Sequence, residues 1–241
     1  MPALHALANP ARFLRIAKPL TPVLLGLGAL LVAFGCWAGL TRTPPDYLQG
    51  ETVRILYIHV PAAWLGMGGW SGVAIASIAY LVWRHPLAAV AARAVALPGA
   101  AFAAICLATG SIWGRPTWGT WWQWDGRLTS MLLLFFVYCG YMALARADAD
   151  RGGDGRLPAL FGIAGTVLLP VIRYSVVWWN TLHQGPSIGL TRSSIDGAIL
   201  WPLWPMIAGF SCLFGGIVLM RMRTALAVQR AEARMKRMAR A

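Results

Sequence analysis

Charged side chains are scarce in this sequence, and acidic ones are the scarcest. Only 12% of its 241 residues are charged, with 21 lysines and arginines against 8 acidic residues, whereas hydrophobic residues make up 58%. Soluble domains carry about 25% charged residues, so a soluble fold of this composition could not cover its surface. The composition excludes a soluble globular protein and predicts a membrane protein, for which lipid replaces water as the main solvent.

Motifs for metal, redox and nucleotide chemistry are also missing. The four cysteines stand alone in apolar stretches and form no CxxC pair, which excludes a cysteine zinc site and a thioredoxin-like redox pair. The sequence has no GxxxxGK[ST] loop, so we expect any ATP used with this protein to be hydrolysed by another subunit. We therefore do not expect the chain to be an enzyme by itself.

The net charge of +13 does not indicate nucleic-acid binding. A nucleic-acid footprint would be a basic stripe with interleaved aromatics, but here the cations lie between long apolar stretches and in the C-terminal tail. Such a distribution is typical of the bias of lysine and arginine toward cytoplasmic loops.

Six apolar stretches are long enough to cross a hydrocarbon core, which takes about 20 helical residues. They are residues 20–40, 60–83, 87–110, 129–145, 158–177 and 199–220. With the N-terminus inside, fourteen cations fall on the inner side and five on the outer side, the latter being Arg42, Arg54, Arg115, Arg127 and Arg192. This difference predicts that both termini are cytoplasmic. We expect an all-α fold, a single six-helix membrane domain over 1–241, with an outer loop at 111–128 and a basic cytoplasmic tail at 221–241.

Tryptophan is concentrated in the predicted outer loop. Five of the thirteen tryptophans fall within twelve residues: Trp113, Trp118, Trp121, Trp122 and Trp124. An interfacial aromatic belt explains one or two per helix end, but not five in one loop. Tryptophan buries a large flat area and keeps one N–H for a polar partner, so the loop predicts a platform for a flat, largely apolar ligand. An extended loop would put Trp118, Trp122 and Trp124 on one face, and a helical one only Trp118 and Trp122.

Charged groups and histidines accompany this platform. Arg115 and Arg127 flank it and could pair with carboxylates, while Asp125 is expected to order the loop by accepting backbone or arginine hydrogen bonds. Two of the four histidines, His59 and His183, fall on the predicted outer side, at the start of the second span and just after the fifth. Two imidazoles are a natural axial pair for haem iron and too few ligands for a zinc site.

At this point the residues resemble a known family. The string Trp118-Gly119-x-x-Trp122-x-Trp124-Asp125 is similar to the WWD signature of haem-handling membrane proteins of cytochrome c biogenesis. The Trp113-Gly-x-Pro ahead of it, the Arg127-Leu-Thr after it and the six spans resemble the CcmC family, over nearly the whole chain.

The resemblance implies a function at the outer face of the bacterial inner membrane. Proteins of this family receive haem (b-type, bound transiently), hold it on the WWD loop with two axial histidines that match His59 and His183, and present it to the haem chaperone CcmE. It further implies a complex with the small membrane protein CcmD and the ABC-transporter subunits CcmA and CcmB. Three residues of the first outer loop, Asp46, Gln49 and Arg54, match family positions tied to the handover of haem.

A haem subunit of quinone-linked electron transfer is the alternative. Such subunits usually place their ligating histidines inside the helices, whereas His59 and His183 are predicted at helix ends. We therefore expect that the protein's haem will not be reduced by quinol and reoxidised by quinone. A redox titration with quinol measures this, and efficient cycling would favour the alternative.

Overall fold

The computed structural model describes residues 9–183, 187–189 and 193–239. His5, Arg192 (one of the predicted outer cations) and Arg240 lie outside the described residues. The helices, in chain order, are α2 (Pro10–Thr41), the 3-10 turn η1 (Glu51–Ile55), α3 (Leu56–Trp83), α4 (Ala88–Trp118), α5 (Gly126–Asp150), α6 (Arg156–Ala164), the 3-10 turn η2 (Gly165–Val167), α7 (Leu168–Trp178), α8 (Gly197–Leu200) and α9 (Leu203–Met238).

Within the described ranges, six helical segments are long and apolar enough to cross a membrane. The predicted all-helical class and the six spans are thereby confirmed. The fifth span is built from α6, η2 and α7, and the sixth from α8 and α9. Helix α9 continues to Met238, so the described part of the basic tail extends the last span as a helix.

The segment predicted as the outer loop, 111–128, is largely helical, and its extent outside the membrane stays a prediction. Helix α4 runs on to Trp118 and α5 begins at Gly126, which leaves only residues 119–125 outside the helices. Helix α4 continues through Gly114 and Pro116, because a proline near a helix end removes few hydrogen bonds. In the same turn, the hydroxyl of Thr117 donates to the Trp113 carbonyl at 2.7 Å.

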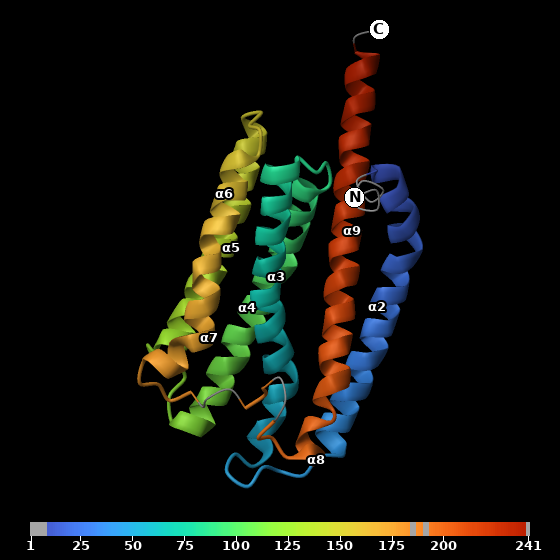
Figure 1. The fold of residues 1–241 in the computed structure, drawn as a ribbon. Helices are drawn as coiled ribbons and strands as arrows, with labels where there is room; N and C mark the ends of the chain where they lie inside the picture. The colour runs from blue at the N-terminus through green and yellow to red at the C-terminus, as the bar shows by residue number, and fades with distance from the viewer. Residues whose placement is uncertain (1–8, 184–186, 190–192, 240–241) are drawn as a thin grey trace.

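The helices form two groups that lie side by side (Figure 1). Helix α2 packs along α9, while α3 to α7 form a bundle in which α3 and α4 share the most extensive contact. Small residues allow the close approach of α2 and α9, because a Cβ added at Gly28 would come within 2.8 Å of the backbone nitrogen of Leu213. This use of small residues is typical of membrane helices, whose association cannot rely on the hydrophobic effect.

The core of the bundle is built around one tryptophan of α3. Trp70 is fully buried and lies edge-on to Tyr138 of α5, with ring centroids 4.8 Å apart. The indole also fills the space beside Gly165, where the fifth span changes from α-helix to the 3-10 turn η2. The hydroxyl of Tyr138 donates to the carbonyl of Gly66 at 2.7 Å, so α3 and α5 are joined by both packing and a hydrogen bond.

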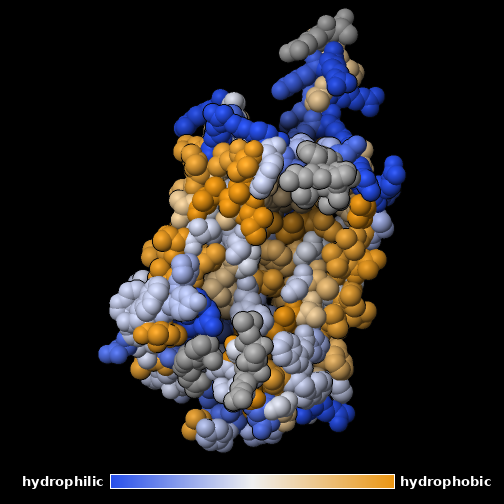
Figure 2. All heavy atoms as spheres, viewed as in Figure 1, coloured by the Kyte–Doolittle hydropathy of each residue, from blue (hydrophilic) through white to orange (hydrophobic). Residues whose placement is uncertain are grey.

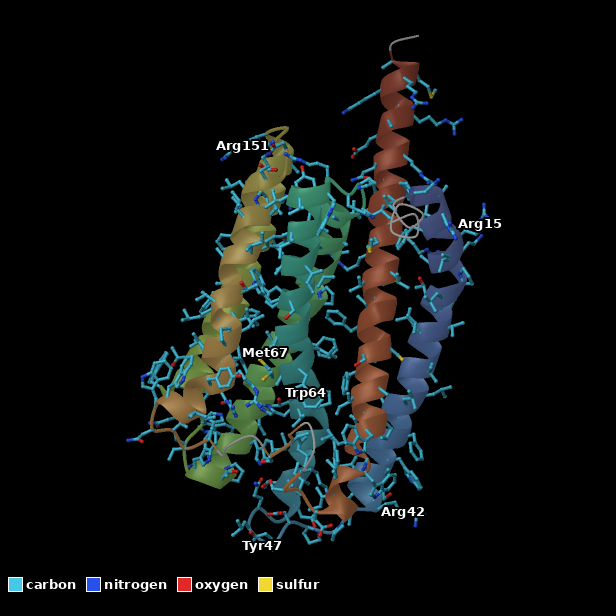
Figure 3. The ribbon with its side chains drawn as sticks, viewed as in Figure 1. Arg15, Arg42, Tyr47, Trp64, Met67 and Arg151 are labelled. Atoms are coloured by element: carbon cyan, nitrogen blue, oxygen red, sulfur yellow. The ribbon has the colours of Figure 1, made fainter. Side chains whose placement is uncertain are left out.

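Polar groups gather at the two ends of the molecule, with an apolar belt between them (Figure 2). Arg15 and Arg151 lie at one end, whereas Arg42 and Tyr47 lie at the other (Figure 3). This grouping matches the one predicted from the charges, although the end that faces the cytoplasm stays a prediction. The first residues of α2 and the last of α9 share one end, and the loop 119–125 lies at the opposite end (Figure 1).

The α2–α9 contact generates a prediction. A Cβ at Gly209 would meet the backbone nitrogen of Val32 at 2.8 Å, whereas one at Gly215 would meet only the Leu24 side chain, at 3.6 Å. We expect Gly209→Ala to destabilise the protein by about 1–3 kcal/mol, since backbone cannot move aside cheaply, and Gly215→Ala to have little effect. Thermal unfolding in detergent measures both, and equal melting temperatures for the two variants would contradict this packing.

Candidate functional site

The last turns of α4 and the loop that follows form the base of the site. Helix α4 ends because Gly119 adopts the left-handed conformation (φ 79°) and its N–H bonds to the Arg115 carbonyl at 3.1 Å. The chain then turns back along the helix, and the hydroxyl of Ser111 donates to the Trp121 carbonyl at 2.7 Å. The tryptophan-rich segment is therefore a helix end with a short loop folded against it, neither fully extended nor fully helical.

His59 lies in the first turns of α3, beside the end of α4. Its Nδ1 lies 3.0 Å from the hydroxyl of Thr109, and that hydroxyl also donates to the Ile105 carbonyl at 2.7 Å. The ring faces the indole of Trp113 edge-on, with centroids 5.6 Å apart. Gly110 leaves room for the imidazole, since a Cβ there would lie 3.0 Å from Cε1.

His183 follows α7 and lies beside the start of α5. Its Nδ1 is 2.7 Å from Oδ2 of Asp125, and the Thr181 hydroxyl also contacts that oxygen. The other carboxylate oxygen of Asp125 accepts the N–H of Leu128 at 2.9 Å, as the N-cap of α5. The indole of Trp118 approaches the imidazole with ring centroids 4.5 Å apart.

The protonation states of this pair follow from its surroundings. Burial raises the pKa of the Asp125 carboxyl, but its hydrogen bonds, led by that from Thr181, outweigh burial and leave the pKa below its ordinary value. Burial lowers the pKa of His183 and prevails over the opposing effect of Asp125. At neutral pH the contact is therefore a hydrogen bond from a neutral imidazole to a carboxylate, and Nε2 carries the free lone pair.

The three tryptophans of the loop differ in exposure. Trp121 and Trp124 are 57% and 75% exposed, and Trp122 packs edge-on against Trp124 with centroids 5.5 Å apart. The indole nitrogen of Trp122 is buried and has no hydrogen-bond partner among the described residues. Exposed aromatic rings beside a buried indole N–H that lacks a partner within the described residues fit a site that a ligand completes.

The two arginines that we expected to flank the platform occupy different positions. Arg115 is exposed and donates to the Gly119 carbonyl at 2.5 Å, so it stabilises the end of its own helix. Arg127 is partly buried in the first turn of α5 and lies within electrostatic range of both His59 and His183. Of the two, Arg127 is the better placed to meet an anionic group of a ligand held by the imidazoles.

The first outer loop is joined to the site by a hydrogen bond of Gln49. The Trp113 indole N–H donates to Oε1 of Gln49 at 2.8 Å. Asp46 instead orders its own turn, accepting the N–H groups of Leu48 and Gln49 at 2.9 and 2.8 Å. Arg54 bonds to the Leu40 carbonyl at 2.5 Å and pairs with Glu51 at 2.7 Å, so Asp46 and Arg54 shape the loop.

Thr181 and Thr109 are functional candidates that the sequence did not indicate. Each hydroxyl contacts a histidine or its partner, yet an isolated threonine near a helix end has no distinctive sequence pattern. A weak signal existed for Thr181, because a threonine two residues before His183 can form a local turn, and its hydroxyl does accept the His183 N–H at 3.1 Å.

The donor set fits a planar iron macrocycle better than a bare metal ion. No group of three or more His, Cys, Asp or Glu side chains able to hold an ion occurs in the described part of the chain. Two imidazoles, both held at Nδ1 by other side chains and both beside indoles, are donors suited to the two axial positions of a haem. Asp125 was expected to order the loop by accepting hydrogen bonds. Its carboxylate accepts one from the Leu128 N–H and another from His183.

The fold and this site define a polytopic membrane protein with a tryptophan and histidine site at one end of its helices. Residues 3–237 match the family model described as Heme exporter protein C, and the chain belongs to that family. It is 49% identical to the heme exporter protein C of Bradyrhizobium diazoefficiens over 90% of this chain and 82% of the relative. It is also 46% identical to that of Escherichia coli (strain K12), over 91% and 89%, and 44% identical to that of Haemophilus influenzae, over 92% and 91%.

The conformation of Gly119 generates the prediction for the loop. An alanine at this left-handed position has open space around its Cβ, so its cost is that of the backbone alone, about 1 kcal/mol. We expect the amides of 119–125 to exchange about fivefold faster in Gly119→Ala, as measured by hydrogen exchange. Gly26→Ala, also in open space but within α2, is the control, and equal exchange of the loop in both variants would contradict the prediction.

Proposed function

We propose that this protein binds haem at the outer face of the bacterial inner membrane and presents it to a haem chaperone during maturation of c-type cytochromes. The observation that carries the proposal is the pair of imidazoles, His59 and His183, each held through Nδ1 at the same end of the molecule. Because Nδ1 is engaged in both rings, each offers Nε2 as a ligand. Membership in the heme exporter protein C family supports haem as the cargo.

The indoles supply the apolar part of the binding. Haem is flat and largely apolar, and burying a few hundred Å² of it at about 25 cal/mol per Å² contributes several kcal/mol. Trp113 and Trp118 stand beside the two histidines, and the exposed Trp121 and Trp124 extend the apolar surface outward. This retention is moderate, which suits a cargo that has to be passed on.

Polar groups of the site suit the acidic edge of haem. Arg127 supplies a partly buried positive charge near both imidazoles, and a guanidinium pairs well with a propionate. The indole N–H of Trp122, which no described residue accepts, would gain an acceptor from the same kind of group. Arg115 caps its own helix and is therefore less available to pair with a propionate.

The chain's contribution to the transfer is binding and orientation. Holding the iron from two sides fixes the plane of the ring, so that one edge can be presented to a partner, and proximity of this kind accelerates reactions between bound groups. We assign the attachment chemistry to the chaperone, a CcmE-like protein, and ATP hydrolysis to CcmA- and CcmB-like transporter subunits, with a CcmD-like small protein in the same complex. Gln49, through its bond to Trp113, links the first outer loop to the site, and Asp46 and Arg54 shape that loop for the handover.

Replacing either histidine with alanine tests the axial pair. We expect His59→Ala and His183→Ala each to lose the six-coordinate bis-histidine spectrum and to purify with less haem, because a ligand to iron is missing, and added imidazole to restore the spectrum in part. His85→Ala is the matched control, since His85 lies in the turn between α3 and α4 at the opposite end of the bundle. Unchanged bis-histidine spectra in both site variants would contradict the proposal.

The role of the chaperone is tested separately. We expect purification together with a CcmE-like partner to reduce the haem bound to this protein and to load the partner, compared with purification alone. Haem spectra and haem staining of the two chains measure the distribution. If loading of the partner did not depend on this protein's two histidines, presentation to the chaperone would be wrong even though haem binding stood.

A further inference from the structure

The two histidines of the site are held by unequal partners. His183 bonds through Nδ1 to the carboxylate of Asp125, at 2.7 Å, and the aspartate side chain is only 3% exposed. His59 bonds through Nδ1 to the hydroxyl of Thr109, at 3.0 Å. One imidazole therefore has a charged acceptor, shielded from water, and the other a neutral one.

The carboxylate at His183 is itself firmly held. Its oxygens accept the Leu128 N–H at 2.9 Å and the Thr181 hydroxyl. The Thr181 oxygen in turn accepts the backbone N–H of His183 at 3.1 Å. Because these bonds join the start of α5 to the segment after α7, the His183 ring is fixed in orientation from both its backbone and its side chain.

The hydroxyl at His59 can only be a modest acceptor. Its hydrogen points to the helix carbonyls of Ile105 at 2.7 Å and Cys106 at 3.2 Å, so it meets His59 with a lone pair and the ring donates from Nδ1. A hydrogen bond to a charged acceptor is roughly twice as strong as one between neutral groups. A carboxylate on the far nitrogen also makes an imidazole a more basic ligand and fixes its tautomer, which a hydroxyl does far less.

We propose that Asp125 is a positioning residue that makes His183 the tighter of the two haem ligands, so that His59 is the ligand released first when haem leaves. This inference rests on the proposed function. The two histidines then have different roles. His183, held by Asp125 and Thr181, keeps the haem bound. His59, on the first turns of α3, dissociates from the iron first. A site with one firm and one labile ligand can hold haem securely and still open one face of the iron to a partner.

A double-mutant cycle on the full-length protein, purified in detergent and titrated with ferric haem, tests the assignment. In the His59→Ala background, where His183 is the remaining ligand, we expect Asp125→Asn to weaken haem binding about ten- to a hundredfold. In the His183→Ala background, we expect the same substitution to have almost no further effect, because the ring that Asp125 holds is gone. Equal losses in both backgrounds would overturn the proposal.

The choice of asparagine separates positioning from a structural role. Asparagine caps helices as well as aspartate does, so the start of α5 is preserved, and the melting temperature of haem-free Asp125→Asn shows how much of any lost haem affinity comes from a loss of stability. The haem midpoint potential of Asp125→Asn should shift positive, since a less basic His183 stabilises ferric iron less. Thr109→Val should shift the potential less, and the opposite order would also overturn the proposal.

The haem affinities of the two single histidine variants test independently whether His183 is the tighter ligand. His59→Ala, which keeps the carboxylate-held ligand, should bind haem more tightly than His183→Ala. If the parent protein bound no haem through its histidines, the proposed function itself would fail. If the parent bound haem normally but both single variants bound it equally, only the assignment of a firm and a labile ligand would fail.

Discussion

The site depends on one buried carboxylate. Asp125 ends the loop 119–125, caps the first turn of α5 and holds His183, which reaches it from the segment after α7. A buried anion is costly unless its oxygens are hydrogen-bonded, and here the backbone, a hydroxyl and an imidazole supply those bonds. Since the same contacts that stabilise the charge also place the histidine, the loop and the ligand are ordered together.

The end of α4 is the scaffold on which the other half of the site is arranged. Trp113 and Trp118 project from its last turns toward His59 and His183 respectively. The helical backbone fixes the position and direction of each of these indoles, which a free loop could not do as precisely. Gly119 then reverses the chain, which returns Trp121, Trp122 and Trp124 to the same end of the molecule. The result is an apolar surface with a rigid inner part and an exposed outer part.

The membrane domain constrains how such a site can be built. Inside the bilayer every backbone group needs a partner within the protein, so irregular structure is restricted to the helix ends, and that is where the loop and both imidazoles lie. The interior is left to packing, with Trp70 and Tyr138 at the centre of the bundle and small residues between α2 and α9. On the face that Figure 2 shows, hydrophilic residues correspondingly gather toward the two ends.

The sequence by itself determined the six spans, the all-helical class and the identity of the unusual residues, because apolar length and residue composition act locally along the chain. It could not set the end of α4, since Gly114 and Pro116 are breakers whose effect depends on the surrounding hydrogen bonds. Nor could it pair Asp125 with His183, or His59 with Thr109, residues about fifty positions apart. Only the tertiary structure decided those pairs, because the packing of α3 and α5 against α4 and of α7 against α5 brings them within hydrogen-bonding distance.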